Sequence, residues 1–175
     1  MRKNTKLTFS GIMAALAVAF MLTSYFPYLT YAIPAIAGLF VMVVVIELDC
    51  KWAAGAYLSS AVLVFLSAEP ESKLLYVLFF GYYPIIKAML ERCRKQLLEW
   101  PAKIILFNAA VLVVYLVLGK AVGFSMEEFG NFGRYGAYLL LAAANAVFIL
   151  YDIAVSRIAM TYMYMLHPKI KKIFK

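Results

Sequence analysis

Few side chains in this 175-residue chain could carry out chemistry, and most catalytic arrangements cannot be built from them. The single histidine, His167, lies near the C-terminus beside Pro168 and Lys169. A zinc site needs several convergent nitrogen, sulfur or oxygen ligands, and a hydrolytic triad needs a base beside its nucleophile. The sequence also lacks the GxxxxGK[ST] loop that binds the phosphates of ATP. We therefore predict that the chain is not an enzyme and needs no metal or other cofactor.

Asp152 is the acidic residue with the most unusual setting, because it interrupts a long apolar stretch. It lies about 6 residues, or roughly 9 Å, from the inner segment expected to begin near Arg157. Lys87 and Asn108 reach comparable depths on other helices. A carboxylate buried in a membrane needs such a partner or takes up a proton. We expect Asp152 to pair with Lys87 or Asn108 and so fix helix register, and proton coupling is the alternative.

Two sets of residues could line a pocket for a small molecule. One set has the spacing i, i+3, i+4 and i+7 and consists of Tyr76, Phe79, Phe80 and Tyr83. The other has a similar spacing and runs from a cation to an amide, through Arg134, Tyr138, Leu141 and Asn145. Aromatic walls with a few placed polar groups are typical of ligand pockets. The alternative for the tyrosines is the aromatic belt that membrane proteins place at the lipid–water interface.

Small residues recur at intervals of four near the N-terminus, at Gly11, Ala15 and Ala19. Residues four apart share one face of a helix. Inside lipid, a stripe of small residues lets a second helix approach closely. The stripe therefore predicts either a docking face for a partner helix or internal packing within the bundle.

These residues lie in a chain whose composition is typical of an integral membrane protein. Apolar residues make up 66% of it and charged residues 15%, against roughly 45–50% and about 25% in soluble domains. A hydrocarbon core about 30 Å thick needs roughly 20 apolar residues per helix. The apolar runs are nearly uninterrupted, whereas the strands of a membrane β-barrel alternate polar and apolar residues. The predicted fold is therefore an all-α polytopic membrane protein.

We place six transmembrane helices in one domain that spans residues 1–175. Pro27 and Pro34 separate the first two helices, because proline disrupts a helix interior. Lys87 has to extend its ammonium toward the interface for the fourth helix to reach full length. The expected bounds are about 7–26, 34–48, 52–68, 74–90, 102–119 and 136–163.

The basic residues indicate the orientation of this bundle. Of the 17 Lys and Arg residues, 14 fall in segments that share the side of the N-terminus, and only Lys73, Lys120 and Arg134 fall on the other side. Loops rich in Lys and Arg stay in the cytoplasm. Both termini are therefore predicted to be cytoplasmic. The net charge of +8 then reflects topology, and no nucleic-acid partner is expected.

Two features leave alternatives open. Ala17-Val18-Ala19 resembles a signal-peptide cleavage site, although the apolar run continues through Leu22, as in a membrane span. The segment 119–135 contains four glycines together with Glu127 and Glu128, and it is either a lid or a connector. The role of the two glutamates stays open.

Taken together, the layout resembles the substrate-binding S component of energy-coupling factor (ECF) vitamin transporters. The shared features are a short basic N-terminus, the stripe at Gly11, Ala15 and Ala19, six helices in fewer than 200 residues, and cytoplasmic termini. The stretches Ile33-Pro34-Ala35 and Trp52-Ala53-Ala54-Gly55-Ala56 are similar to the second-to-third helix region of that family. The stretch from Gly81 to Lys87 is similar to an uncharacterised bacterial family of six-helix membrane proteins.

The resemblance implies a subunit in the bacterial cell membrane that binds a vitamin-like small molecule under its first outer loop. It also implies docking of the Ala15–Ala19 face onto a transmembrane coupling subunit driven by two ATPase subunits. The residues expected to bind the substrate are Tyr31, Tyr76, Tyr83, Arg134, Tyr138 and Asn145. The alternative is a non-transporting membrane scaffold that packs against partner helices.

Overall fold

The fold is known from a computed structural model, which describes residues 3–26, 29–92, 96–122 and 133–173. Of these residues, 92% are helical and none lies in a strand. The prediction of an all-α protein is therefore confirmed. Long apolar stretches without strand alternation leave helices as the way to satisfy the backbone hydrogen bonds internally.

The described residues form eight α-helices and two irregular helical turns. In chain order they are α1 (Lys3–Leu22), the 3-10 turn η1 (Thr23–Tyr25), α2 (Ala32–Glu47), α3 (Cys50–Ser67), α4 (Pro70–Leu75), the π-helical turn η2 (Tyr76–Phe80), α5 (Tyr83–Arg92), α6 (Gln96–Val122), α7 (Gly133–Met165) and α8 (His167–Ile173).

Four helical stretches among the described residues are long and apolar enough to cross a membrane. They are Lys3–Tyr25, Cys50–Ser67, Pro70–Arg92 and Leu141–Met165, and Ala32–Glu47 is a shorter apolar helix. Their length and composition are those of a membrane protein.

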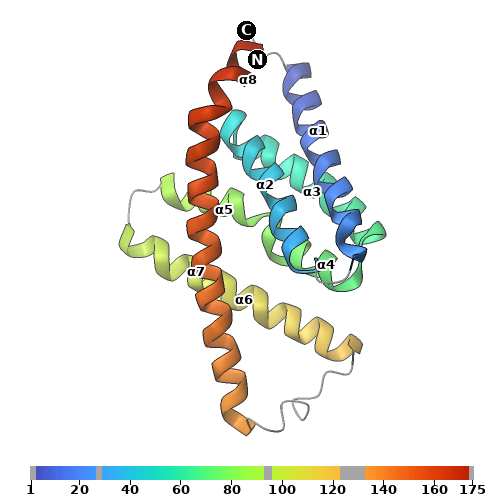
Figure 1. The fold of residues 1–175 in the computed structure, drawn as a ribbon, viewed down its shortest axis with the longest axis vertical. Coiled ribbons are helices and arrows are strands. Elements are labelled where there is room, and N and C mark those ends of the chain that lie inside the picture. Colours follow the sequence, from blue (N-terminus) through green and yellow to red (C-terminus); the bar gives the residue numbers. More distant parts are fainter. Residues whose placement is uncertain (1–2, 27–28, 93–95, 123–132, 174–175) are drawn as a thin grey trace.

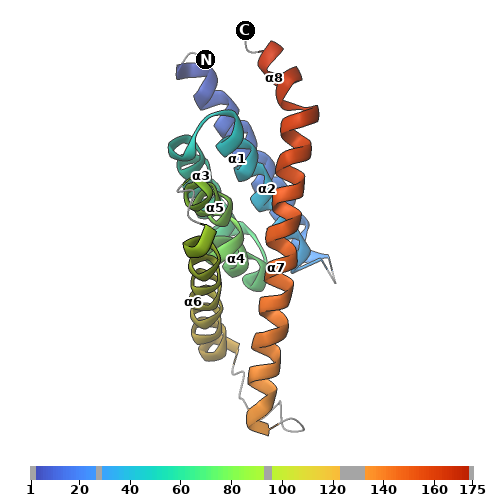
Figure 2. The same ribbon diagram turned by 90° about the vertical axis from the view of Figure 1, so that its left-hand side faces the viewer.

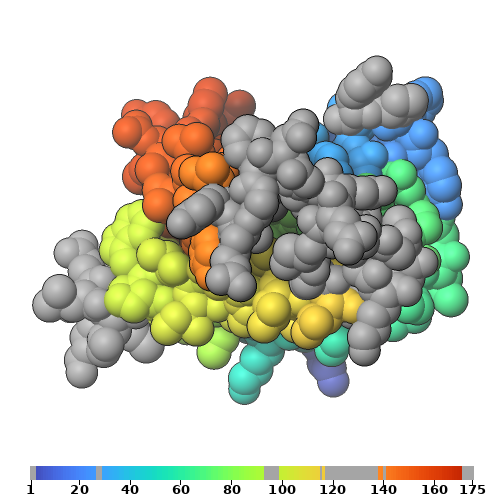
Figure 3. Space-filling model, turned by 90° about the horizontal axis from the view of Figure 1, so that it is seen from below, coloured from blue at the N-terminus to red at the C-terminus, as the bar shows by residue number. Residues whose placement is uncertain are grey.

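The helices form a packed body of α1, α2, α3 and α5, against which α7 lies as one long rod (Figures 1 and 2). The helix α6 crosses α7 near the middle of α7, and the N-terminal half of α7 extends beyond the body (Figure 1). Seen from that far end, α6 runs across the molecule with α7 along one side of it (Figure 3). The start of α1 and the helix α8 lie at the same end of the molecule (Figures 1 and 2).

Three apolar clusters hold these elements together. The first joins α1, α2, α3 and α5 through Phe9, Ala14, Val41, Val44, Ala53, Ala56 and Ile85. The second joins α1, α2 and α3 to Tyr76 of η2. The third connects η2 and α5 to α6 and α7 through Phe79, Tyr83, Ala110 and Phe148. Phe107 and Phe148 stack with ring centroids 4.6 Å apart, which fixes the crossing of α6 and α7.

The segment 74–90, expected as one helix, is divided into α4, η2 and α5. Pro84 has no N–H group and clashes with the carbonyl four residues earlier, so the helix cannot run through it regularly. The N–H of Gly81 instead donates to the carbonyl of Tyr76, five residues back, at 2.8 Å. The Tyr57 hydroxyl donates to the carbonyl of Val77 at 2.7 Å and supports the widened turn from α3.

Gly38 allows α2 to approach this widened turn closely. A Cβ atom added at Gly38 would overlap the backbone carbonyl oxygen of Phe80, and it would lie 3.6 Å from the Tyr151 hydroxyl. The overlap is with backbone, so it cannot be relieved by a side-chain rotation. Gly38 is therefore the residue at which α2, η2 and α7 can come together.

We expect Gly38→Ala to lower the free energy of unfolding by about 1–3 kcal/mol, because α2 and η2 must separate to make room for the methyl group. Gly55→Ala on α3 is the matched control, since a Cβ there meets nothing within 4 Å. The control should be neutral or should stabilise by up to about 1 kcal/mol through helix propensity. Denaturant unfolding of both variants in detergent measures the difference, and equal stabilities would contradict the close packing of Gly38.

Candidate functional site

Asp152 of α7 lies at the centre of a buried group of charged and polar side chains. The Tyr83 hydroxyl and the Lys87 ammonium, both from α5, donate to its Oδ1 atom. The Lys103 ammonium of α6 donates to the Oδ2 atom at 3.2 Å. The three charged side chains are only 2–6% exposed. One carboxylate therefore joins three helices through three donors.

Two further carboxylates complete the group. Glu91 of α5 lies 2.9 Å from the Lys87 Nζ atom and 3.5 Å from the Lys103 Nζ atom. Glu99 of α6 accepts from Lys103 at 2.6 Å. We call these residues, together with Tyr83 and Asp152, the Asp152 cluster. Glu91 is exposed, so the cluster extends from the helix crossing to the protein surface.

The charge pairing in the cluster is what makes burial of Asp152 tolerable. Removing an ion from water costs several kcal/mol, and the cost is recovered only with good geometry and additional hydrogen bonds. Asp152 has an ammonium on each oxygen and a hydroxyl besides. The arrangement can hold three helices at one depth, and it can also offer a path for protons between ionisable groups.

The expectation that Asp152 pairs with Lys87 or Asn108 is confirmed, and Lys87 is the partner. Asn108 instead exchanges two hydrogen bonds with Asn145 of α7, at 3.0 and 3.1 Å. Lys103, at the start of the expected helix 102–119, was not predicted as a partner. Its spacing of four residues from Glu99 was the available signal.

The paired amides form a second polar link between α6 and α7. Besides their mutual bonds, Asn108 donates to the carbonyl of Ile104 and Asn145 to that of Leu141, each at 2.8 Å. Interhelical amide bonds of this kind help to hold helices together in lipid. Asn145, expected to bind substrate, is thus engaged within the protein.

The other predicted substrate residues lie in separate places. Tyr76 is buried in the second apolar cluster, where its hydroxyl lies 2.7 Å from the Ser60 hydroxyl. Tyr83 is buried in the third, against Asp152. Tyr138 is exposed, and the side chain of Arg134 lies outside the described residues, as do Glu127 and Glu128. The face expected from Tyr76 to Tyr83 is therefore split between two clusters.

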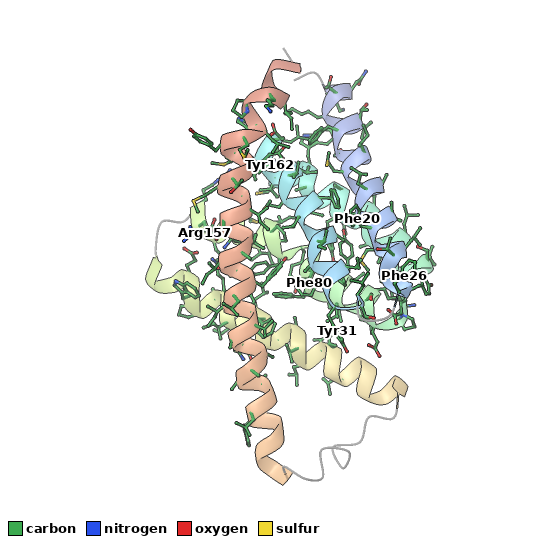
Figure 4. All side chains as sticks on the ribbon, in the orientation of Figure 1. Phe20, Phe26, Tyr31, Phe80, Arg157 and Tyr162 are labelled. Carbon is green, nitrogen blue, oxygen red and sulfur yellow. The ribbon has the colours of Figure 1, made fainter. Side chains whose placement is uncertain are left out.

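Tyr31 is exposed beside the acidic start of α4. Its hydroxyl lies 3.5 Å from the Glu71 carboxylate. Partial burial, and next the negative charge of Glu71, raise the pKa of Tyr31. Tyr31 and Phe26 lie at the end of the α1–α2 pair that is far from Tyr162 (Figure 4).

The small-residue stripe of α1 faces outward. Gly11, Ala15 and Ala19 are all exposed, whereas Ala14 and Ala17 face the core. A Cβ added at Gly11 meets no atom within 4 Å. In the described part of the chain, the stripe is therefore not used for internal packing, and the docking alternative stays open.

Comparison with known proteins adds no relationship: no family model matches the sequence, and neither a curated protein nor a solved structure is significantly similar to the chain.

We expect Asp152→Asn to lower the free energy of unfolding by about 3 kcal/mol, because two buried ammonium groups lose part of their compensating charge. Arg157→Gln is the control: this exposed residue lies on the same helix outside the Asp152 cluster, and its replacement should change stability by less than about 0.5 kcal/mol. Denaturant unfolding of both variants in detergent is the measurement. If Asp152→Asn lowered the free energy of unfolding as little as Arg157→Gln does, the Asp152 cluster would have no structural role.

Proposed function

We propose that the chain is the membrane-embedded substrate-binding subunit of an ECF-type uptake system for a small molecule such as a vitamin. The observation that carries the proposal is the outward-facing stripe of Gly11, Ala15 and Ala19 on α1. A face of small residues, exposed along a helix whose other side is buried, is suited to close contact with a partner helix.

The proposal includes six membrane crossings with both termini in the cytoplasm. The stretch α4–η2–α5 forms one crossing, and α1, α2, α3, α6 and α7 form the others. The asymmetry of 14 basic residues against 3 supports this orientation. The start of α1 and the helix α8 lie at one end of the molecule, which agrees with it (Figure 1). The stripe then begins near the middle of α1 and extends toward its outer end.

The partner in this proposal is a transmembrane coupling subunit that carries two ATPase subunits. The sequence contains no phosphate-binding loop of its own, so an ATP-driven process needs such subunits. The large apolar side chains beside the stripe, at Ile12, Leu16 and Phe20, are also exposed and would widen the contact.

The substrate would enter from the end opposite the termini. Tyr31 and the N-terminal half of α7, which carries Tyr138 and Asn145, both lie toward that end (Figure 4). Arg134 belongs to the same half of α7. These residues remain the proposed contacts for the substrate. The hydroxyls of Tyr76 and Tyr83 are already bonded within the protein. These two side chains would therefore shape the inner side of the site.

A second candidate is a non-transporting scaffold that packs against partner helices through the same stripe. The observation that favours it is the internal pairing of Tyr76, Tyr83 and Asn145, which leaves fewer groups for a substrate. Both candidates need the docking face, and only the first needs a ligand.

Ala15→Leu should abolish co-purification of partner subunits from the native membrane, because the longer side chain keeps the partner helix at a distance. Ala154→Leu on α7 is the matched control, since Ala154 is also exposed and lies outside the stripe. The isolated Ala15→Leu protein should unfold like the wild type. Retention of all partners by Ala15→Leu would contradict the docking face.

Screening of vitamins against the purified protein by thermal unfolding separates the two candidates. A true ligand present at 100 times its Kd stabilises the folded state by about 2.7 kcal/mol. In the transport proposal one compound raises the Tm, and it does so equally in Ala15→Leu. An unchanged Tm with every compound, together with retained partner binding, would favour the scaffold.

A further inference from the structure

Glu47, the last residue of α2, is a buried carboxylate at an unfavourable position. Its side chain is only 5% exposed. The C-terminus of a helix carries a partial negative charge, so an anion there needs donors from outside its own helix. The Tyr162 hydroxyl of α7 donates to the Glu47 Oε1 atom at 2.9 Å. The His167 Nδ1 atom lies 3.1 Å from the same oxygen.

His167 is the first residue of α8, directly after the turn at Leu166 that ends α7. Its side chain is 35% exposed, so it can exchange a proton with solvent. A protonated imidazole donates from both ring nitrogens and carries a positive charge toward Glu47. A neutral imidazole has no charge, and one of its tautomers places a lone pair against the carboxylate. The contact is therefore stronger when His167 is protonated.

The elements packed around this pair also carry other charged groups. The elements around α2, α7 and α8 here contribute Lys3, Lys6, Asp49, Lys51, Arg157 and Lys169. The sequence of α8 also contains Lys171 and Lys172. Asp49 caps α3 by accepting from the backbone N–H groups of Lys51 and Trp52. Among the described residues, His167 alone forms an ion pair with Glu47.

We propose that Glu47, Tyr162 and His167 form a pH-sensitive clasp that fastens α8 to α2 and α7. Histidine changes its charge between about pH 5 and 8. The ion pair is present at the acidic end of this range and is lost as the pH rises. The clasp then loosens, α8 becomes freer to leave the bundle, and Glu47 keeps only the Tyr162 hydroxyl. This inference rests on the contacts of Glu47 and does not depend on a transport function.

Hydrogen exchange of the full-length protein in lipid nanodiscs tests the clasp. Protection of the α8 amides, corrected for the intrinsic effect of pH on exchange, is compared at about pH 5.5 and about pH 8. Wild-type protection should be up to about fivefold higher at the lower pH, the size expected for a partly exposed ion pair. His167→Gln should show equal, low protection at both values, and His167→Lys should show equal, high protection.

Lys169→Gln is the control, because it removes a charge from α8 without touching the clasp, and it should keep the wild-type pH response. Glu47→Gln should lose the response. The side chain of His167 is partly exposed, so its variants are the ones expected to fold normally. An equal protection of α8 at both pH values in the wild type, or a pH response that persists in His167→Gln, would overturn the proposal.

Discussion

The crossing of α5, α6 and α7 depends on how the buried negative charge of Asp152 is neutralised. A carboxylate at a buried helix crossing is costly unless charges and hydrogen bonds surround it. Here the compensation comes from two other helices, through Lys87 and Tyr83 of α5 and Lys103 of α6. The three helices must therefore cross at the depth of Asp152. The apolar stacking of Phe107 on Phe148 adds to this crossing but would not by itself fix its depth.

The irregular turn η2 precedes the helix that supplies two of the donors to Asp152. Pro84 breaks the helix, and α5 starts again at Tyr83. Within α5, Tyr83, Lys87 and Glu91 are four residues apart and so share one face, which is turned toward Asp152. Gly38 lets α2 approach the broken turn. The rigid rod of α7 then connects the Asp152 cluster to Tyr162 and the clasp at Glu47.

Sequence patterns predicted the class of protein because composition and apolar run length are properties of the whole chain. The pair Asp152–Lys87 was predictable because few charged residues reach that depth. Lys103 was not predicted because it stands at the edge of the expected helix 102–119, whereas α6 begins at Gln96 and so places Lys103 about two turns inside the helix. The face from Tyr76 to Tyr83 was wrongly treated as regular, since a π-helical turn changes the angular spacing of residues. The contact of Glu47 with His167 joins residues 120 positions apart, and no local pattern indicates it.

The most direct test of the central claim is a double-mutant cycle between Asp152→Asn and Lys87→Met, measured as free energies of unfolding in detergent. The Asp152 cluster predicts that the two changes are coupled by at least about 1 kcal/mol, because each removes the reason for the other charge to be buried. If the changes in the free energy of unfolding caused by the two single substitutions add up to that of the double variant within about 0.3 kcal/mol, the two residues do not share one buried site. The account of how α5, α6 and α7 are held together would then be wrong.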